Sequence, residues 1–121
     1  MKFNRFEEID VWKQACELCK EIYLLTNSEV ISKDFGFKDQ LRRSSVSIPS
    51  NIAEGYERKS NTEFVRFLYI AKGSAGELRT QLYIAKEINY ISNERFDELF
   101  KKAEEISKSL SGFIKYLQAK I

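Results

Sequence analysis

Apolar residues recur at helical spacing along most of the chain and predict four long amphipathic helices. The first is expected over residues 9–26, where positions 9, 12, 15, 16, 19, 22 and 23 are apolar. The other three are expected over residues 36–55, 61–87 and 93–119. In the last of these, apolar residues alternate spacings of three and four without a break, which is typical of a coiled-coil seam. Residues 27–34 are expected to form a loop.

Short connections between long helices predict an all-α, up-down antiparallel four-helix bundle in one domain, residues 1–121. Capping residues in the sequence support the predicted ends of the helices. Ser60 and Glu63 form an S-x-x-E capping box before the third helix, and Ser92 is placed to cap the fourth. Gly55 fits a C-terminal cap of the second helix in the left-handed conformation.

The only proline, Pro49, falls inside the second helical pattern, where it removes a backbone donor at a cost of roughly 3 kcal/mol. We expect the helix to continue through it with a kink. Polar and small residues around it, and on the third helix, occupy positions where a plain bundle would be apolar. We interpret them as a structural polar network or an oligomer seam: Ser47, Pro49, Ser50, Asn51, Glu54, Gly73, Ser74, Glu77 and Gln81.

Two glycines of the third helix, Gly73 and Gly76, lower helix propensity by about 1 kcal/mol each. A close approach by another helix is the compensation that we expect. Glu54 and Glu77 could instead face each other as an acid/base pair. A structural hydrogen-bond network is the interpretation that we favour for them, because no nucleophile and base are paired in the sequence.

The chain has no histidine, which removes the commonest general base and the commonest metal ligand. Cys16 and Cys19 satisfy the C-x-x-C pattern, but no second such pair or histidine completes a zinc site. We interpret them as core thiols in the first helix. No enzymatic activity, metal, cofactor or small-molecule substrate is predicted.

The net charge is only +2, but residues 38–79 carry eight positive and five negative side chains. This excess indicates an anionic partner, and binding to RNA or DNA is the first interpretation. Its candidate residues are Arg42, Arg43, Arg58, Lys59 and Arg66. The alternatives are that these cations merely pair with neighbouring carboxylates, or that the bundle is a protein-interaction scaffold. The start has no apolar signal segment and no apolar run is long enough to span a membrane, so we expect a cytoplasmic protein.

The central stretch resembles that of a known family. The matching residues are Arg43, residues 46–55 (Val-Ser-Ile-Pro-Ser-Asn-Ile-Ala-Glu-Gly), Arg58, residues 67–74, Glu77-Leu78 and Gln81-Leu82, with Val11-Trp12-Lys13 and Tyr90-Ile91-Ser92 outside it. This pattern is similar to that of the bacterial 23S rRNA-intervening-sequence proteins. The family is similar in fold to the accessory variability protein of diversity-generating retroelements.

The resemblance implies an up-down four-helix bundle that assembles into a homopentameric barrel and binds RNA or DNA, with no enzymatic activity. A pentamer would also give the second apolar face of the middle helices a surface to pack on. The sequence departs from many relatives at Ser44 and Ser45, where alanines are common. Both serines are small, so the expected fold is unchanged and only the local polarity differs.

Overall fold

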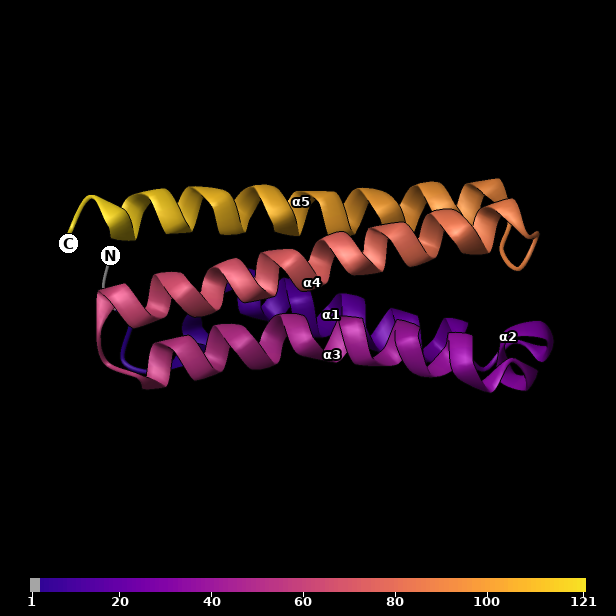
Figure 1. The fold of residues 1–121 in the computed structure, drawn as a ribbon, viewed down its shortest axis with the longest axis horizontal. Coiled ribbons are helices and arrows are strands. Elements are labelled where there is room, and N and C mark those ends of the chain that lie inside the picture. The colour runs from indigo at the N-terminus through magenta and orange to yellow at the C-terminus, as the bar shows by residue number, and fades with distance from the viewer. Residues whose placement is uncertain (1–2) are drawn as a thin grey trace.

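The structure is a computed structural model that describes residues 3–121, and every regular element in that range is helical. The elements are a 3₁₀ turn, η1 (Phe6–Glu8), and the helices α1 (Asp10–Leu25), α2 (Glu29–Lys33), α3 (Phe35–Glu57), α4 (Asn61–Glu87) and α5 (Asn93–Gln118). The four long helices run alternately up and down, so both termini lie at the same end (Figure 1). An all-helical bundle is therefore confirmed.

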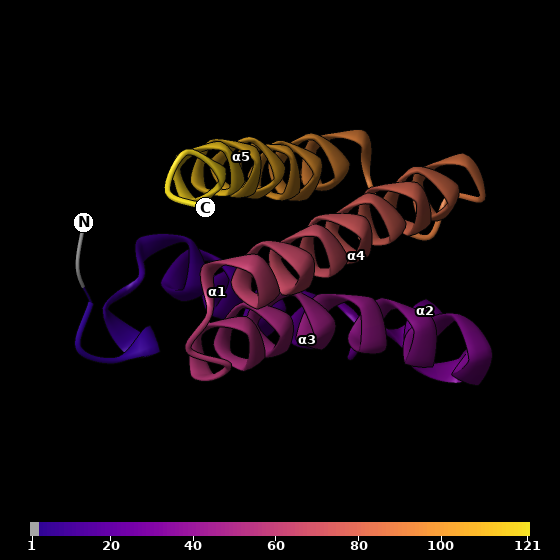
Figure 2. The ribbon, with the colours of Figure 1, turned by 60° about the vertical axis from the view of Figure 1, so that its left-hand side comes forward.

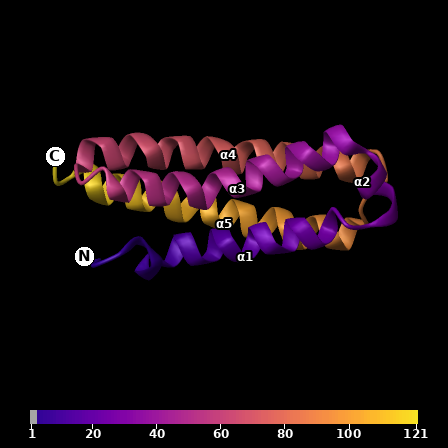
Figure 3. The same cartoon turned by 90° about the horizontal axis from the view of Figure 1, so that it is seen from below.

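Neighbours in the chain are also neighbours in space. α3 packs along α4, α4 packs along α5, and α1 lies against α3. Figure 2 shows α4 between α3 and α5, and Figure 3 shows α1 and α5 on the opposite side from α3 and α4. The seam between α1 and α5 is the least closely packed of the four.

One core holds the helices together. Each long helix contributes fully buried aliphatic side chains: Leu18 and Ile22, Leu41, Ile48 and Ile52, Leu68, Leu78 and Leu82, and Leu99 and Leu110. Leu18 lies outside the stripe predicted for the first helix, whose Cys16 and Cys19 are only half-buried and whose Tyr23 is exposed. Burying one such side chain contributes about 1.5–3 kcal/mol, so this shared core is the main source of the bundle's stability. Among the helices described in residues 3–121, none is both long and apolar enough to cross a bilayer.

The segment 27–34, predicted as a loop, contains the short helix α2. Ser28 caps this helix by accepting a hydrogen bond from the Ile31 amide at 3.3 Å, and the Ile31 side chain is fully buried. Asp34 then caps α3 through the Phe37 amide at 3.2 Å. A helix of five residues is too short for its apolar positions to show a helical period. Ser28 and Asp34, the two capping residues, were therefore the only sequence features that indicated it.

The prediction that Gly55 ends the second helix in the left-handed conformation is wrong. α3 continues to Glu57, and the left-handed residue is Lys59, with φ of 58°. Gly55 is buried where α3 meets α4, and a Cβ there would lie 2.7 Å from the Phe67 Cβ. The glycine is needed for the approach of two helices, because any side chain would force them apart.

The expected close approach at Gly73 and Gly76 is also wrong within the chain. A Cβ at Gly73 would have no atom within 4 Å, and one at Gly76 would meet only the Arg79 guanidinium at 3.7 Å. Pro49, by contrast, lies inside α3 as predicted, and its ring is buried. Ser60 and Ser92 cap α4 and α5, accepting from the amides three residues on at 3.3 and 3.0 Å.

Candidate nucleic-acid interface

The five predicted cations fall into two groups rather than one patch. Arg42 and Arg43 lie in the first half of α3, whereas Arg58, Lys59 and Arg66 surround the turn between α3 and α4. A helix rises 1.5 Å per residue, so about 24 Å separates Arg42 from Arg58. A single phosphate therefore cannot contact both groups.

Arg42 is committed to a structural contact. Its Nε donates to the Thr26 Oγ1 at 2.8 Å, and its Nη2 donates to the Asn27 Oδ1 at 3.2 Å. The guanidinium also stacks over the Tyr23 ring, 4.4 Å from its centroid. These contacts join α3 to the end of α1, so the main role of Arg42 is to stabilise the packing of these two helices.

Arg58 and Arg66 form a charge-balanced cluster at the α3–α4 turn. Arg58 contacts the Glu54 carboxylate at 3.1 Å, and Arg66 contacts Glu63 at 3.3 Å. Both guanidinium groups also lie over the Phe67 ring. The hydrogen bond from Arg66 lowers the pKa of Glu63, which keeps that carboxylate charged. All four side chains are partly exposed, so these ion pairs are weak and a phosphate can compete for them.

Arg43 and Lys59 are the predicted cations with the fewest competitors. Arg43 is 79% exposed, and its one ion pair, with Asp39, is long at 3.9 Å. Lys59 is exposed at the tip of the turn and has no ion-pair partner within residues 3–121. These two side chains are therefore the ones in the predicted set that are available to an anion.

The predicted polar network lies between α3 and α4. The Ser47 and Ser74 hydroxyls are 2.8 Å apart, and the Asn51 Nδ2 donates to both the Ser47 carbonyl at 2.8 Å and its hydroxyl at 2.9 Å. Other predicted members lie apart from these bonds. Ser50, Gly73 and Glu77 are exposed, and Glu54, also exposed, pairs with Arg58.

A second set of bonds extends the network by two residues that sequence reasoning missed. The Ser44 hydroxyl donates to the Gln81 Oε1 at 2.7 Å, and the Gln81 Nε2 is 3.5 Å from the Gln40 Oε1. Ser44 was visible only as a departure from the alanines common in relatives. Here its hydroxyl has a partner on α4, which explains how a serine is accommodated at a buried position.

A pocket of about 290 Å³ opens above this network. It is lined by Gln40, Arg43, Ser44, Ser47, Glu77 and Gln81. Glu77 lines this pocket but Glu54 does not, so the structure does not bring the two carboxylates of the alternative acid/base pair together here. The opposite charges of Arg43 and Glu77 also make the pocket nearly neutral.

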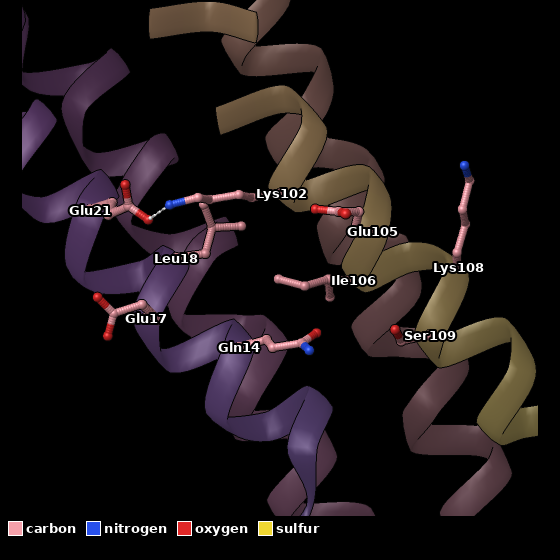
Figure 4. Close-up of a pocket in the computed structure, with 9 residues that line it drawn as sticks. All are labelled: Gln14, Glu17, Leu18, Glu21, Lys102, Glu105, Ile106, Lys108 and Ser109. Atoms are coloured by element: carbon pink, nitrogen blue, oxygen red, sulfur yellow. Dashed lines mark hydrogen bonds and ion pairs between the residues drawn. The ribbon is translucent and has the colours of Figure 1, made fainter. Parts of the chain in front are cut away.

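A larger pocket, of about 490 Å³, follows the loose seam between α1 and α5 (Figure 4). Leu18 and Ile106 form its apolar floor, and the Glu21 carboxylate meets the Lys102 Nζ at 2.6 Å. Glu17 and Glu105 add two further carboxylates to the lining. Three glutamates and two lysines, Lys102 and Lys108, line this pocket, so it has no excess of positive charge for a polyanion.

The two cysteines of α1 are free thiols. Both are half-buried, and the Ser45 hydroxyl lies 3.6 Å from the Cys19 sulfur. Burial raises the pKa of the Cys16 thiol, which makes it less reactive. Within residues 3–121, no group of three or more His, Cys, Asp or Glu side chains is placed to hold a metal ion.

The outer face of α4 carries large apolar side chains that are about half exposed. Ile70, Ile84 and Ile88 are 42%, 43% and 47% exposed, and Val46 of α3 is 38% exposed. Exposed aliphatic residues that share one helix face are candidates for contact with another protein. Ile70, Ile84 and Ile88 share this face with residues of the predicted polar set (Gly73, Ser74, Glu77 and Gln81), so the mixed face is the candidate for the expected oligomer seam.

Comparisons with known proteins place the chain in a family. The sequence model of the 23S rRNA-intervening sequence proteins matches residues 7–112. A crystal structure from Bacteroides thetaiotaomicron, of a protein with unknown function from the S23 ribosomal protein family, is 30% identical with a TM-score of 0.80. The match covers 87% of this chain and 98% of that one. No curated protein matches. The chain therefore belongs to the 23S rRNA-intervening sequence protein family.

Proposed function

We propose that the protein is a non-enzymatic, homo-oligomeric helical bundle that binds RNA or DNA. The observation that carries this proposal is the state of Lys59, which lies at the tip of the α3–α4 turn beside Arg58 and Arg66 and has no ion-pair partner among the described residues. Arg58 and Arg66 beside it hold carboxylates only through exposed ion pairs, which contribute at most about 1 kcal/mol each. Phosphate oxygens can replace those carboxylates at little cost.

Self-association would strengthen a weak patch. The exposed stripe of Ile70, Ile84 and Ile88 supports an interface between copies, and the pentamer implied by the family would present five turns to one nucleic acid. Linked sites act through effective concentration, so avidity exceeds the affinity of each subunit by roughly 10²–10⁴-fold. A subunit of net charge +2 is therefore compatible with useful binding.

The same apolar stripe favours a second candidate function, a scaffold that binds another protein without nucleic acid. The two candidates differ in their response to salt. Phosphate contacts release counterions, so affinity falls steeply as salt rises, whereas an apolar interface is largely insensitive to salt. The scaffold is favoured if the oligomer does not bind nucleic acid at any salt concentration.

The test is fluorescence anisotropy of a labelled RNA titrated with the protein and with the double variant Arg43→Gln/Lys59→Gln. We expect the unaltered protein to bind and the variant to bind about tenfold more weakly with a shallower salt dependence. A matched control is Lys13→Gln/Lys20→Gln, which removes the same charge from α1. Equal weakening by both variants would mean that only overall charge matters, and no binding by any protein would reject the proposal.

A further inference from the structure

The charges of α4 and α5 are distributed very unevenly along each helix. Residues 64–76 contain Arg66 and Lys72 and no Asp or Glu, and residues 106–121 contain Lys108, Lys115 and Lys120 and likewise no Asp or Glu. Over residues 92–105, by contrast, five carboxylates outnumber three cations. The small net charge of the whole chain therefore hides two short basic segments.

The fold places these two segments side by side. α4 and α5 are antiparallel and packed along their length, with Tyr83 facing Phe96 at a ring separation of 6.4 Å. That pairing sets the first half of α4 opposite the second half of α5. Lys72 of the first segment and Lys115 of the second thus lie at the same part of the α4–α5 surface. Arg66 instead pairs with Glu63, just before its segment, and Lys108 lines the pocket between α1 and α5.

A groove of about 390 Å³ opens between these segments. It is lined by Tyr69, Lys72, Ser111, Gly112, Ile114, Lys115 and Gln118. One lysine therefore comes from each helix, and neither has an ion pair within residues 3–121. The groove between α1 and α5 differs in that three glutamates accompany the two lysines in its lining.

The other groups of the groove suit a nucleotide chain. Ser111 and Gln118 supply hydroxyl and amide donors, and the Tyr69 ring is half exposed, as a surface for base stacking requires. Gly112 has no side chain, and a Cβ built there would meet no atom within 4 Å, so the groove is open at this point. Two amino groups, two polar groups and one aromatic ring match a phosphodiester backbone with an unpaired base.

We propose that the α4–α5 groove binds the backbone of single-stranded nucleic acid through Lys72 and Lys115, with a base stacked on Tyr69. This inference rests on the proposed function and adds a site to it. Arg42 and Arg58 are held by the end of α1 and by Glu54, whereas the two lysines of the groove, like Lys59, have no ion pair within residues 3–121. The groove therefore adds two available cations to Arg43 and Lys59 as phosphate contacts of the subunit.

The main test is anisotropy of a labelled 20-nucleotide poly(U) RNA at about 50 and 200 mM salt. Lys72→Gln/Lys115→Gln should weaken binding about tenfold or more and reduce the slope of log affinity against log salt by about 1.4 per occupied site, since each contact with a single strand contributes about 0.7. The matched control Lys13→Gln/Lys20→Gln should change affinity less than about twofold. Tyr69→Ala should weaken binding roughly tenfold without changing the slope.

A second pair of variants addresses the groove without touching its lysines. Gly112→Glu and Gly112→Gln both replace an exposed helical glycine with a better helix former, so both should fold at least as well as the unaltered protein. They differ by one charge. Gly112→Glu should bind poly(U) at least about fivefold more weakly than Gly112→Gln, because only the glutamate adds a negative charge to the lining of the groove.

The outcomes separate this inference from the proposed function. If Arg43→Gln/Lys59→Gln weakens binding but the groove variants behave like the α1 control, the groove is rejected and the proposed function stands. If the unaltered protein binds neither RNA nor DNA, both fail. If poly-glutamate competes as well as RNA and Tyr69→Ala binds normally, the groove takes an acidic protein segment and the nucleic-acid assignment is overturned.

Discussion

Gly55 of α3 and Phe67 of α4 are in contact so close that a Cβ at Gly55 would lie 2.7 Å from the Phe67 Cβ and 3.2 Å from the Phe64 carbonyl oxygen. Side-chain carbon atoms do not approach to that distance, so an alanine would push the helices apart. The approach of α3 and α4 at this point therefore requires glycine, which has a hydrogen atom where other residues have a Cβ. The position lies just before the α3–α4 turn, which makes the geometry of Lys59 dependent on it.

Gly55→Ala should lower the free energy of unfolding by roughly 1–3 kcal/mol, the usual effect of overpacking. Gly73→Ala is the matched control in the neighbouring helix, where the added methyl group meets nothing. It should raise stability by up to about 1 kcal/mol, because alanine favours the helix. Urea denaturation measures both, and equal effects of the two substitutions would contradict the packing argument.

Glu21 should be the most important carboxylate of the α1–α5 seam. It is only 16% exposed and contacts Lys102 at 2.6 Å and Arg95 at 3.5 Å. Glu21→Gln should cost about 1–3 kcal/mol of stability because it weakens two charge-assisted contacts. Glu17→Gln, at an exposed site with a 3.8 Å pair to Lys20, should cost under about 1 kcal/mol. A smaller loss for Glu21 than for Glu17 in urea denaturation would refute this.

Asn51 should matter more than Glu54 to the network around Pro49. Asn51 donates two hydrogen bonds to Ser47 in a partly buried site, whereas Glu54 has an exposed pair with Arg58. We expect Asn51→Ala to cost roughly 1–2 kcal/mol and Glu54→Ala under about 1 kcal/mol. Thermal melts and light scattering check stability and oligomer size together. Unchanged values for Asn51→Ala would show that the network is not structural.

Alkaline pH should weaken the bundle through Tyr90. Its hydroxyl donates to the Asp34 Oδ2 at 2.8 Å, and this hydrogen bond raises the Tyr90 pKa above the ordinary value of 10.0. The folded protein therefore holds this proton more tightly than the unfolded chain does. Its contribution to stability is complete below about pH 10 and is lost as pH rises through the folded pKa. Urea midpoints measured from pH 8 to 11 should fall more steeply for the unaltered protein than for Tyr90→Phe, and parallel curves would contradict the assignment.

The helices could be predicted because their periodicity reflects one core. Phe64, Leu68 and Leu78 of α4 lie on the predicted stripe and are buried. Gly55 was misread because a glycine near a helix end suits either a cap or a close contact, and only the position of Phe67 distinguishes them. A helix cap and a close helix contact both appear in the sequence as a glycine near the end of a helix.

The candidate binding residues were harder to predict because the order of charges along the chain does not reveal which of them form ion pairs. Arg58 and Arg66 looked available, yet each meets a carboxylate from a neighbouring turn of helix. Lys72 and Lys115 are distant in sequence, and only the antiparallel contact of α4 with α5 brings them to one groove. Counting the charged residues separately in each half of α4 and α5 would have indicated both lysines from the sequence.

The most direct test of nucleic-acid binding by an oligomer of this chain is light scattering of the purified protein at two salt concentrations, with and without an RNA of mixed length. We predict an oligomer that forms a larger complex with RNA at low salt and releases it at high salt. A stable oligomer whose mass is indifferent to RNA would contradict nucleic-acid binding and favour the scaffold. A monomer would contradict the assembly on which the avidity argument depends.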